Sequence, residues 1–363
     1  MYQERIAKVL EKMKSLGQTQ LIISDPMTIF YLTGKMIEPG ERLVALILKS
    51  DDNHVAVINR LFPVLESEIN MPIIPVDDTN EGKGIVVLSE QLNHAESIGV
   101  DKNWPAEFLL GLMKQVGASY DHYTFSSDIT DEIRGIKSED EINLMKDVSK
   151  DNDTAVGLLA DLIPLELTEL EMTERLGDIY EDLGNSGFSF DPIVAYGANG
   201  ADPHHMNDGS TVKKGDSIIL DIGGVKNGYC SDMTRTFFYQ EVSDKSREVY
   251  ETVLEANKRA IATVKPGVTF AEIDAAARDY ITEKGYGEYF THRTGHFIGM
   301  ECHEAGDVSA INHNVVQPGM IFSIEPGIYI AGEVGVRIED LVVATEDGCE
   351  LLNHYPKELT IIK

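Results

Sequence analysis

The stretch from residue 212 to residue 236 constrains the fold most, because it predicts a tight β-hairpin that carries two aspartates. Its dipeptide Asn227-Gly228 is a strong signal for a two-residue hairpin turn, and strand-forming residues lie on both sides of it. A turn there pairs Asp221 with Thr234 and puts Asp232 on the same face, since side chains alternate along a strand. The two aspartates are then diagonal neighbours about 7 Å apart.

Two carboxylates at that separation repel each other. If their face is buried, protons or cations must offset the charge, because burying a bare carboxylate is costly. The alternative is a hairpin that faces solvent, on which the aspartates only add solubility. The stretch by itself leaves both interpretations open.

The hairpin pattern recurs once in the chain, at a constant offset of 104 residues. Val212, Gly215, Asp221 and Gly223 correspond to Val316, Gly319, Glu325 and Gly327. The second hairpin is expected to have strands 321–330 and 336–344, joined by the turn AGEVG. Alternation along its returning strand puts Arg337 and Glu339 on one face. Each hairpin therefore supplies two carboxylates.

The helices expected before each hairpin repeat as well. Thr168-x-x-Glu171 and Thr269-x-x-Glu272 are capping boxes, and each opens an amphipathic helix. Each half of this region thus follows the order helix, helix, hairpin. Two such halves related by a pseudo-two-fold axis would bring all four carboxylates to a common centre.

Histidines lie between the two hairpins, at His292, His296 and His303. Taken singly, such residues are more typical of a surface or a core than of a metal site. Beside four converging carboxylates, an imidazole suits Mn²⁺, Co²⁺, Fe²⁺ or Zn²⁺ better than Ca²⁺, and four carboxylates balance the charge of two divalent ions. A pair of such ions would hold a bridging hydroxide as nucleophile and polarise a carbonyl.

The region before the repeat has a different pattern. Residues 1–127 alternate helical and strand-like segments, with strand-like runs at 21–24, 42–49, 54–60, 72–76 and 97–101, which indicates an α/β domain. Residues 128–137 are polar and charged and are expected to be a linker. A capping box that starts at Ser138 then opens the repeat-bearing domain, 138–363.

Charge and composition exclude several functions. The net charge of -30, from 31 Lys+Arg and 61 Asp+Glu, argues against nucleic acid or an anionic membrane as a partner. The N-terminus reads as an amphipathic helix, and no run approaches about 18 apolar residues, so a cytoplasmic protein is expected. The three cysteines are widely spaced and predict no disulfide framework.

One known family shares this constellation. The five residues Asp221, Asp232, His296, Glu325 and Glu339, in that order, resemble the metal ligands of the pita-bread metallopeptidases, which include methionine aminopeptidase, aminopeptidase P and prolidase. The resemblance implies an α+β fold: a pita-bread catalytic domain with an internal pseudo-two-fold repeat, preceded by an α/β N-terminal domain of the proline-directed branch. The segment ERL after YLTG, and the length of 363 residues, are most similar to bacterial Xaa-Pro dipeptidases.

The resemblance also implies a role for each ligand. Asp221 would chelate one of two divalent ions, and His296 and Glu325 would hold the other. Asp232 and Glu339 would bridge the two ions, and Glu325 would also carry the nucleophile's proton to the leaving amine. Mn²⁺ is the expected metal, with Co²⁺ and Zn²⁺ as alternatives.

Further residues match the family's substrate site. His204 and His303 correspond to two histidines that bind substrate and stabilise the tetrahedral intermediate. Arg337 corresponds to an arginine that orients the catalytic carboxylates and the substrate, with Tyr329 as a weaker supporting candidate. His205 has no such counterpart and is expected to be structural.

Two positions depart from the family pattern. Some prolidases have an arginine four residues after the second histidine, where this chain has Asp307. Similar bacterial dipeptidases usually have a histidine where this chain has Gly40. In those enzymes the loop reaches the site of a partner subunit, so Glu41 and Arg42 are expected to contact substrate in a homodimer.

The resemblance predicts hydrolysis of Xaa-Pro dipeptides, with a small peptide that has proline in second position as substrate. The nearest alternative is an aminopeptidase P that removes the residue before proline from longer peptides. A non-peptidase hydrolase or lyase on the same fold, and a non-catalytic metal-binding scaffold, are more distant alternatives.

Overall fold

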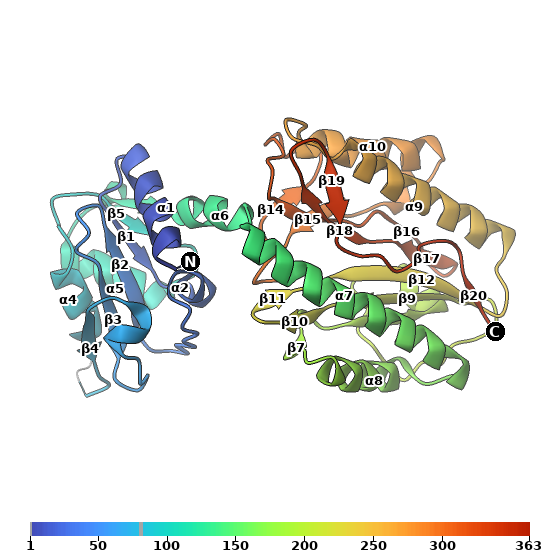
Figure 1. Cartoon of the computed structure of the whole chain (residues 1–363), viewed down its shortest axis with the longest axis horizontal. Coiled ribbons are helices and arrows are strands. Elements are labelled where there is room, and N and C mark those ends of the chain that lie inside the picture. Colours follow the sequence, from blue (N-terminus) through green and yellow to red (C-terminus); the bar gives the residue numbers. More distant parts are fainter. Residues whose placement is uncertain (1, 80–82) are drawn as a thin grey trace. The chain divides into compact units, whose positions relative to one another are not determined.

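The computed structural model describes residues 2–79 and 83–363, and the chain divides into two compact units, Met1–Arg134 and Gly135–Lys363. Figure 1 labels most of the helices and strands of both units. Each unit has its own hydrophobic core. Among the residues that the model describes, no helix combines the length and apolarity needed to cross a membrane.

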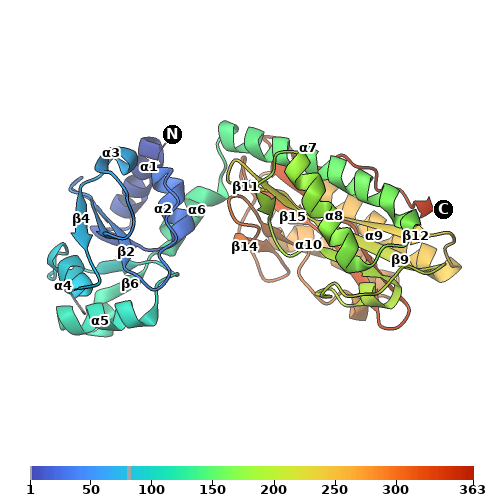
Figure 2. The same ribbon diagram turned by 90° about the horizontal axis from the view of Figure 1, so that it is seen from below.

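The first unit is built on a six-stranded mixed sheet with the strand order β4-β3-β2-β1-β5-β6. Helices α1 and α2 lie on one side of this sheet and α4 and α5 on the other (Figure 2). The elements are α1 (Tyr2–Ser15), β1 (Gln20–Ile23), α2 (Pro26–Thr33), β2 (Val44–Lys49), β3 (Val55–Asn59), α3 (Glu66–Ile69), β4 (Ile73–Val76), α4 (Lys83–Glu90), β5 (Ile98–Val100), α5 (Ala106–Val116), η1 (Tyr120–His122), β6 (Tyr123–Phe125) and α6 (Ser127–Gly135).

The five strand-like runs of the sequence correspond to β1 to β5, whereas β6 was not predicted. The segment 128–137, expected to be a linker, lies mostly within helix α6. The helix buries Ser127, Ile129, Thr130 and Arg134, although most of its residues are polar. The domain boundaries read from the sequence remain a prediction.

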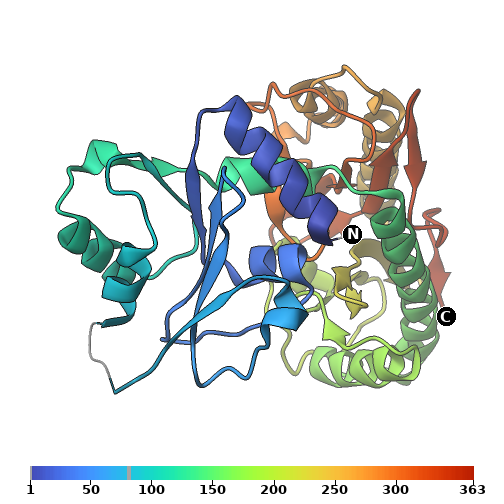
Figure 3. The ribbon, with the colours of Figure 1, turned by 60° about the vertical axis from the view of Figure 1, so that its left-hand side comes forward.

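The second unit repeats one arrangement of helices and strands. Helices α7 and α8 pack on strands β8, β9 and β12, and α9 and α10 pack on the strands of the second half. Figure 3 shows α7 in green and α8 in yellow-green beside these strands. The first half has α7 (Glu139–Leu162), η2 (Ile163–Leu165), α8 (Glu169–Asp182), β7 (Gly187–Phe188), β8 (Ile193–Tyr196), η3 (Gly197–Ala201), β9 (Ser217–Ile222), β10 (Gly224–Lys226), β11 (Tyr229–Cys230) and β12 (Met233–Tyr239).

The second half follows the same order. Its elements are α9 (Asp244–Thr263), α10 (Phe270–Glu283), η4 (Gly287–Tyr289), β13 (Gly295–Phe297), β14 (Glu304–Val308), β15 (Ile321–Ile324), β16 (Gly327–Ile330), β17 (Val334–Arg337), β18 (Asp340–Ala344), β19 (Cys349–Leu351) and β20 (Ile361–Ile362). The predicted capping boxes are present at the starts of α7, α8 and α10. The first helix of each half also forms an equivalent hydrogen bond to its sheet. In α7, Asn152 Nδ2 donates to the carbonyl of Ile222, and in α9, Asn257 Nδ2 donates to the carbonyl of Ile324.

The first hairpin has the predicted register. Strands β9 and β12 pair antiparallel with Asp221 opposite Thr234. Beyond them β10 and β11 continue to the turn, where Asn227 and Gly228 have φ of 53° and 80°. Positive φ at both positions is the requirement of a type I′ turn, which explains the Asn-Gly dipeptide.

The second hairpin is interrupted, which the sequence did not predict. Strands β15 and β18 pair as far as Ile324 opposite Asp340, and pairing resumes at Gly327 opposite Arg337. The break falls at Pro326, which has no N–H to donate to a ladder. Glu325 and Glu339 lie at this break, outside the regular strands.

Candidate metal centre

Strand ends position the carboxylates of the centre. Asp221 lies in β9, and Asp232 immediately precedes β12. In the second half, Glu325 immediately follows β15 and Glu339 immediately precedes β18. Asp221, Asp232 and Glu339 are buried, and the Glu325 side chain is 17% exposed.

His296 lies among these carboxylates. Its Nε2 is 3.4 Å from Asp232 Oδ2 and 3.7 Å from Glu325 Oε1. Its Nδ1 is 3.1 Å from the carbonyl oxygen of Phe297, which can only accept, so Nδ1 donates and the neutral ring keeps its lone pair on Nε2. Asp232, His296 and Glu339 offer one ligand atom each within 4.8 Å of one another.

Arg337 connects both halves of the repeat. Its Nη2 donates to Asp221 Oδ2 over 2.6 Å, its Nη1 to the Tyr329 hydroxyl over 2.8 Å, and its Nε to Thr234 Oγ1 over 3.1 Å. Thr234 Oγ1 in turn donates to Glu339 Oε2 over 2.8 Å. One oxygen of Asp221 and one oxygen of Glu339 therefore accept a hydrogen bond within this network, whereas the second oxygen of each carboxylate does not.

Three buried carboxylate oxygens have no hydrogen-bond partner in the described part of the chain. They are Asp221 Oδ1, Asp232 Oδ1 and Glu339 Oε1. Burial, together with the neighbouring carboxylates, raises the pKa of Asp232 and of Glu339 well above the usual range. Buried oxygens without partners are rare and call for an ion or a proton. Oxygen-rich donors with one imidazole fit divalent transition metals, so the residues fit a metal centre.

Glu325 differs from the other carboxylates. Burial acts to raise its pKa, but the charges of His296, His292 and Arg337 outweigh burial, and the pKa of Glu325 is lowered. Ser323 Oγ donates to its Oε1 over 3.3 Å. Glu325 is therefore ionised at neutral pH in this arrangement.

The two histidines expected at the substrate site lie in exposed positions. The ring of His303 meets that of His296 edge to face, with 4.2 Å between the centroids. Its ring is only partly shielded from solvent, and this partial desolvation, followed by the charges of His296 and Arg293, lowers the pKa of His303 to about 4. His204 is close enough for its charge to contribute to the same shift.

Several contacts of the centre were missed from the sequence. Cys302 Sγ donates to Asp232 Oδ2 over 3.4 Å. Arg293 is an exposed cation, and its charge also lowers the pKa of Glu325, although burial and the charges of His296, His292 and Arg337 have larger effects on that pKa. The contacts of Thr234 with Arg337 and Glu339 were also missed, although the predicted pairing of Thr234 with Asp221 already placed it next to the centre. Cys302 and Arg293 neighbour histidines in the chain but follow no pattern that marks them.

Asp307, Glu41 and Arg42, which the comparison with the family pattern singled out, have contacts within their own units. Asp307 lies in β14 opposite His296, and its Oδ1 accepts from Ser309 Oγ over 2.8 Å. Glu41 and Arg42 belong to the first unit, where they pair with each other over 2.7 Å. Arg42 Nε also donates to Asp78 over 3.0 Å, and Glu41 is exposed.

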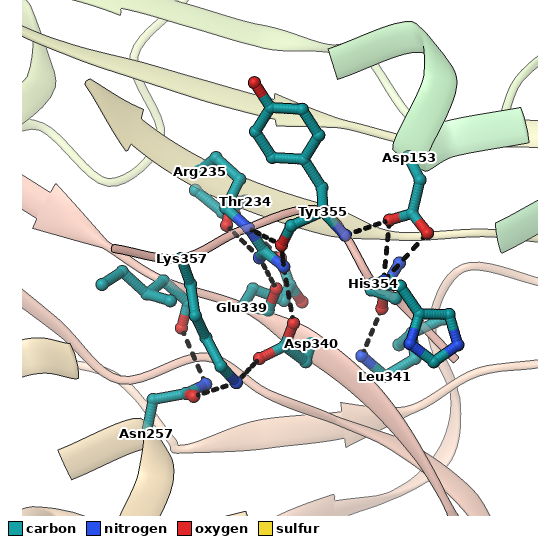
Figure 4. Close-up of polar contacts among 12 residues, drawn as sticks. Asp153, Thr234, Arg235, Asn257, Glu339, Asp340, Leu341, His354, Tyr355 and Lys357 are labelled. Carbon is teal, nitrogen blue, oxygen red and sulfur yellow. Dashed lines mark hydrogen bonds and ion pairs between the residues drawn. The ribbon is translucent and has the colours of Figure 1, made fainter. Parts of the chain in front are cut away.

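A second polar network joins Arg235 of β12 to Asp340 of β18, the chain neighbours of Thr234 and Glu339 (Figure 4). Arg235 Nη1 donates to the carbonyl of Glu339 over 2.6 Å, and its Nη2 donates to Asp340 Oδ1 over 2.7 Å. Lys357 Nζ donates to the other oxygen of Asp340 and to Asn257 Oδ1. The backbone of Glu339 is thus fixed by a fully buried ion pair.

This fold, with its buried carboxylates and histidine, defines a metal-dependent hydrolase. The model of metallopeptidase family M24 matches residues 143–346, and that of the creatinase/prolidase N-terminal domain matches residues 5–136. The chain belongs to metallopeptidase family M24 and has the pita-bread fold, as the sequence predicted. It is a metal-dependent peptidase.

Solved structures agree over nearly the whole chain. The Xaa-Pro dipeptidase from Bacillus anthracis is 30% identical, with a TM-score of 0.89 over 99% of this chain and 100% of that one. The dipeptidase PepE from Mycobacterium ulcerans is 32% identical, with a TM-score of 0.91 over 99% of this chain and 98% of that one. An uncharacterized peptidase from Staphylococcus aureus strain MRSA252 is 34% identical over 97% of this chain and 99% of its own length.

Proposed function

We propose that the chain is an Xaa-Pro dipeptidase that uses two divalent ions. The observation that carries the proposal is that three buried carboxylate oxygens, Asp221 Oδ1, Asp232 Oδ1 and Glu339 Oε1, have no hydrogen-bond partner among the described residues. His296 Nε2 lies 3.4 Å from the other oxygen of Asp232. The resemblance to dipeptidases over nearly the whole chain supports the substrate class.

The proposed holders of the ions are Asp221, Asp232, His296, Glu325 and Glu339. A bound pair of divalent ions supplies activation of water at neutral pH and polarisation of a carbonyl. Mn²⁺ is the proposed metal, since carboxylates outnumber the single imidazole, and Co²⁺ or Zn²⁺ would also be accepted.

The side chains of this site have separate tasks in the proposal. Glu325, ionised because its pKa is lowered, accepts a proton from the attacking water and delivers it to the leaving nitrogen. His303, whose pKa is lowered to about 4, is neutral at pH 7 and donates a hydrogen bond from its ring to the substrate oxygen. His204 binds substrate from the neighbouring loop.

Arg337 and Arg293 complete the site. Arg337 fixes Asp221 and, through Thr234, Glu339, and so orients two of the ligands. Arg293 is an exposed cation beside His303 and Glu325, and it offers a charge for the free carboxylate of a dipeptide, which Asp307 cannot. A bond before proline has no N–H, so a site that protonates the leaving nitrogen and encloses the ring prefers it.

We further propose a cytoplasmic homodimer, in which Glu41 and Arg42 contact substrate in the site of a second copy. The exposure of Glu41, held by Arg42, supports a contact outside the first unit's core. The free thiols of Cys230, Cys302 and Cys349 suit a reducing compartment.

The test uses the metal-free full chain, loaded with Mn²⁺, Co²⁺ or Zn²⁺ and assayed with an Xaa-Pro dipeptide, an Xaa-Pro-Xaa tripeptide and an Xaa-Ala dipeptide. We expect cleavage of the Xaa-Pro dipeptide alone. Cleavage of only the tripeptide would identify an aminopeptidase P instead. Bound metal without cleavage of any peptide would contradict the peptidase proposal.

A further inference from the structure

Glu169 is a fully buried carboxylate at the first position of helix α8, outside the metal centre. Its two oxygens accept four hydrogen bonds, all from the segment 196–208. Oε1 accepts from the backbone N–H of Tyr196 and from Asn199 Nδ2, both over 2.9 Å. Oε2 accepts from His205 Nε2 over 2.6 Å and from the backbone N–H of Asp208 over 3.0 Å.

The four donor residues flank His204 in the sequence. Two of the donors precede it in the chain and two follow it, and His205 is its direct neighbour. His204 is exposed, and its backbone N–H donates to Asp202 Oδ1 over 3.0 Å. Its position therefore depends on the residues that Glu169 binds.

The internal repeat provides a comparison for this position. In the first half the N–H groups of Glu169 and Leu170 donate to the carbonyls of Ser210 and Asp208. In the second half the N–H groups of Phe270 and Ala271 donate in the same way to Asn314 and Asn312. Phe270 thus occupies the place of Glu169 and packs on Phe297 and Phe322 in the apolar core.

An apolar side chain therefore serves the helix and its strand connection equally well at this position. A buried carboxylate is costly, and the helix N-terminus offsets only part of that cost. In the first half, by contrast, the carboxylate binds the segment that carries His204 and its neighbour His205. In the second half His303 lies on the corresponding segment, and the side chain of Phe270 makes no hydrogen bond to it.

We propose that Glu169, with His205, is a positioning residue that fixes His204 for substrate, an inference that rests on the proposed role of His204. Only a carboxylate can serve here, because all four partners are donors. Glutamine has the same shape, but its amide nitrogen would face two of those donors.

The test is a double-mutant cycle in the full-length, metal-loaded enzyme, with Glu169→Gln, His204→Ala and the double variant. We expect Glu169→Gln to lower kcat for an Xaa-Pro dipeptide about 10- to 100-fold, the cost of a misplaced group, with KM and metal content nearly unchanged. In the double variant, kcat should equal that of His204→Ala, because a histidine that is absent cannot be misplaced. Glu171→Gln, an exposed residue of the same helix turn, is the matched control and should keep full kcat.

Full kcat in Glu169→Gln, or losses that multiply in the double variant, would overturn the positioning role. An unchanged kcat in His204→Ala would instead refute the role of His204 in the proposed function, so the two failures are distinguishable. If Glu169→Gln does not fold, His205→Gln removes a contact whose histidine is 12% exposed. The kcat of His205→Gln should also fall in the enzyme that retains His204, but His205→Gln should cause no further loss in the His204→Ala background. An unchanged kcat in His205→Gln would overturn the inference.

Discussion

Arg337 and Asp221 form an ion pair across the two halves of the repeat, with 2.6 Å between Nη2 and Oδ2. The same guanidinium binds Tyr329 and Thr234, so three bonds fix its plane. Arg337 therefore acts on the centre by geometry as well as by charge.

Replacement of Arg337 by lysine should weaken metal binding while the fold is retained. Lysine keeps the charge but cannot form the planar fork, so Asp221 and Thr234 lose one of their fixed partners. We expect metal affinity to fall about 10- to 100-fold, measured by competition with a chelating dye. Arg259→Lys, in an exposed helical pair with Glu255, is the control and should bind metal normally.

Asp232→Asn should lose bound metal and activity together, because an amide cannot replace a carboxylate that contacts His296 and the metal site. His303→Ala should lose activity and retain the metal, since His303 is assigned to substrate. Metal content by mass spectrometry and hydrolysis of an Xaa-Pro dipeptide check both variants. An active Asp232→Asn enzyme would refute the assignment of the centre.

The stability of the metal-free protein should fall as pH rises. Burial and neighbouring carboxylates raise the pKa of Asp232 and Glu339 in the folded chain, so the folded state binds more protons than the unfolded state. This contribution is complete below about pH 4, where unfolded carboxyl groups titrate, and is lost as pH rises through the folded pKa values. Thermal unfolding in chelator between pH 5 and 8 measures the slope.

Asp232→Asn is the internal control for this slope, because asparagine does not titrate. The variant should show a flatter dependence of Tm on pH than the metal-free wild type. Equal slopes would mean that the buried carboxylates do not govern the pH dependence.

Gly335→Ala should impair activity without loss of metal. A Cβ at Gly335 would lie 1.7 Å from the carbonyl oxygen of Gly200, in the segment that leads to His204. The segment must shift, and we expect kcat/KM to fall by at least about tenfold. Gly348→Ala meets no atom within 4 Å and should behave like the wild type in the same assay.

Arg235→Met should destabilise the folded chain by about 3 to 5 kcal/mol, which is the usual cost of removing one partner from a buried ion pair. Asp340 would keep Lys357 but lose the guanidinium that also holds the carbonyl of Glu339. Urea unfolding measures the change. Lys146→Met breaks an exposed pair with Glu350 and should cost about 1 kcal/mol or less.

Local signals were enough to predict the first hairpin, the repeat and five of the six strands of the first unit. Asn227-Gly228 fixed the register of the first hairpin because the turn type demands positive φ at both residues. The five proposed ligands could be named because their order and motifs resemble those of a known family, and their separate roles remain predictions.

The remaining features depend on contacts between distant segments. The helical structure of residues 127–135 was not predicted, because its charged residues obscured the buried positions Ile129, Thr130 and Arg134. Pro326 was visible in the sequence, but the alternating pattern of residues 321–330 was interpreted as one continuous strand, so the interruption was missed. Glu169 looked like one more acidic residue at a helix start, and only the folded segment 196–208 reveals its partners.

The network around Asp340 has a consequence for the order in which the enzyme becomes competent. Lys357 and the carbonyl of Tyr355 bind Asp340 and Arg235, yet both follow Glu339 in the chain. During synthesis the first hairpin can form well before these residues exist. Arg235 and Asp340 therefore acquire these partners only after the segment around Lys357 has been synthesised, so the network around Asp340 is among the last parts of the second unit to be completed.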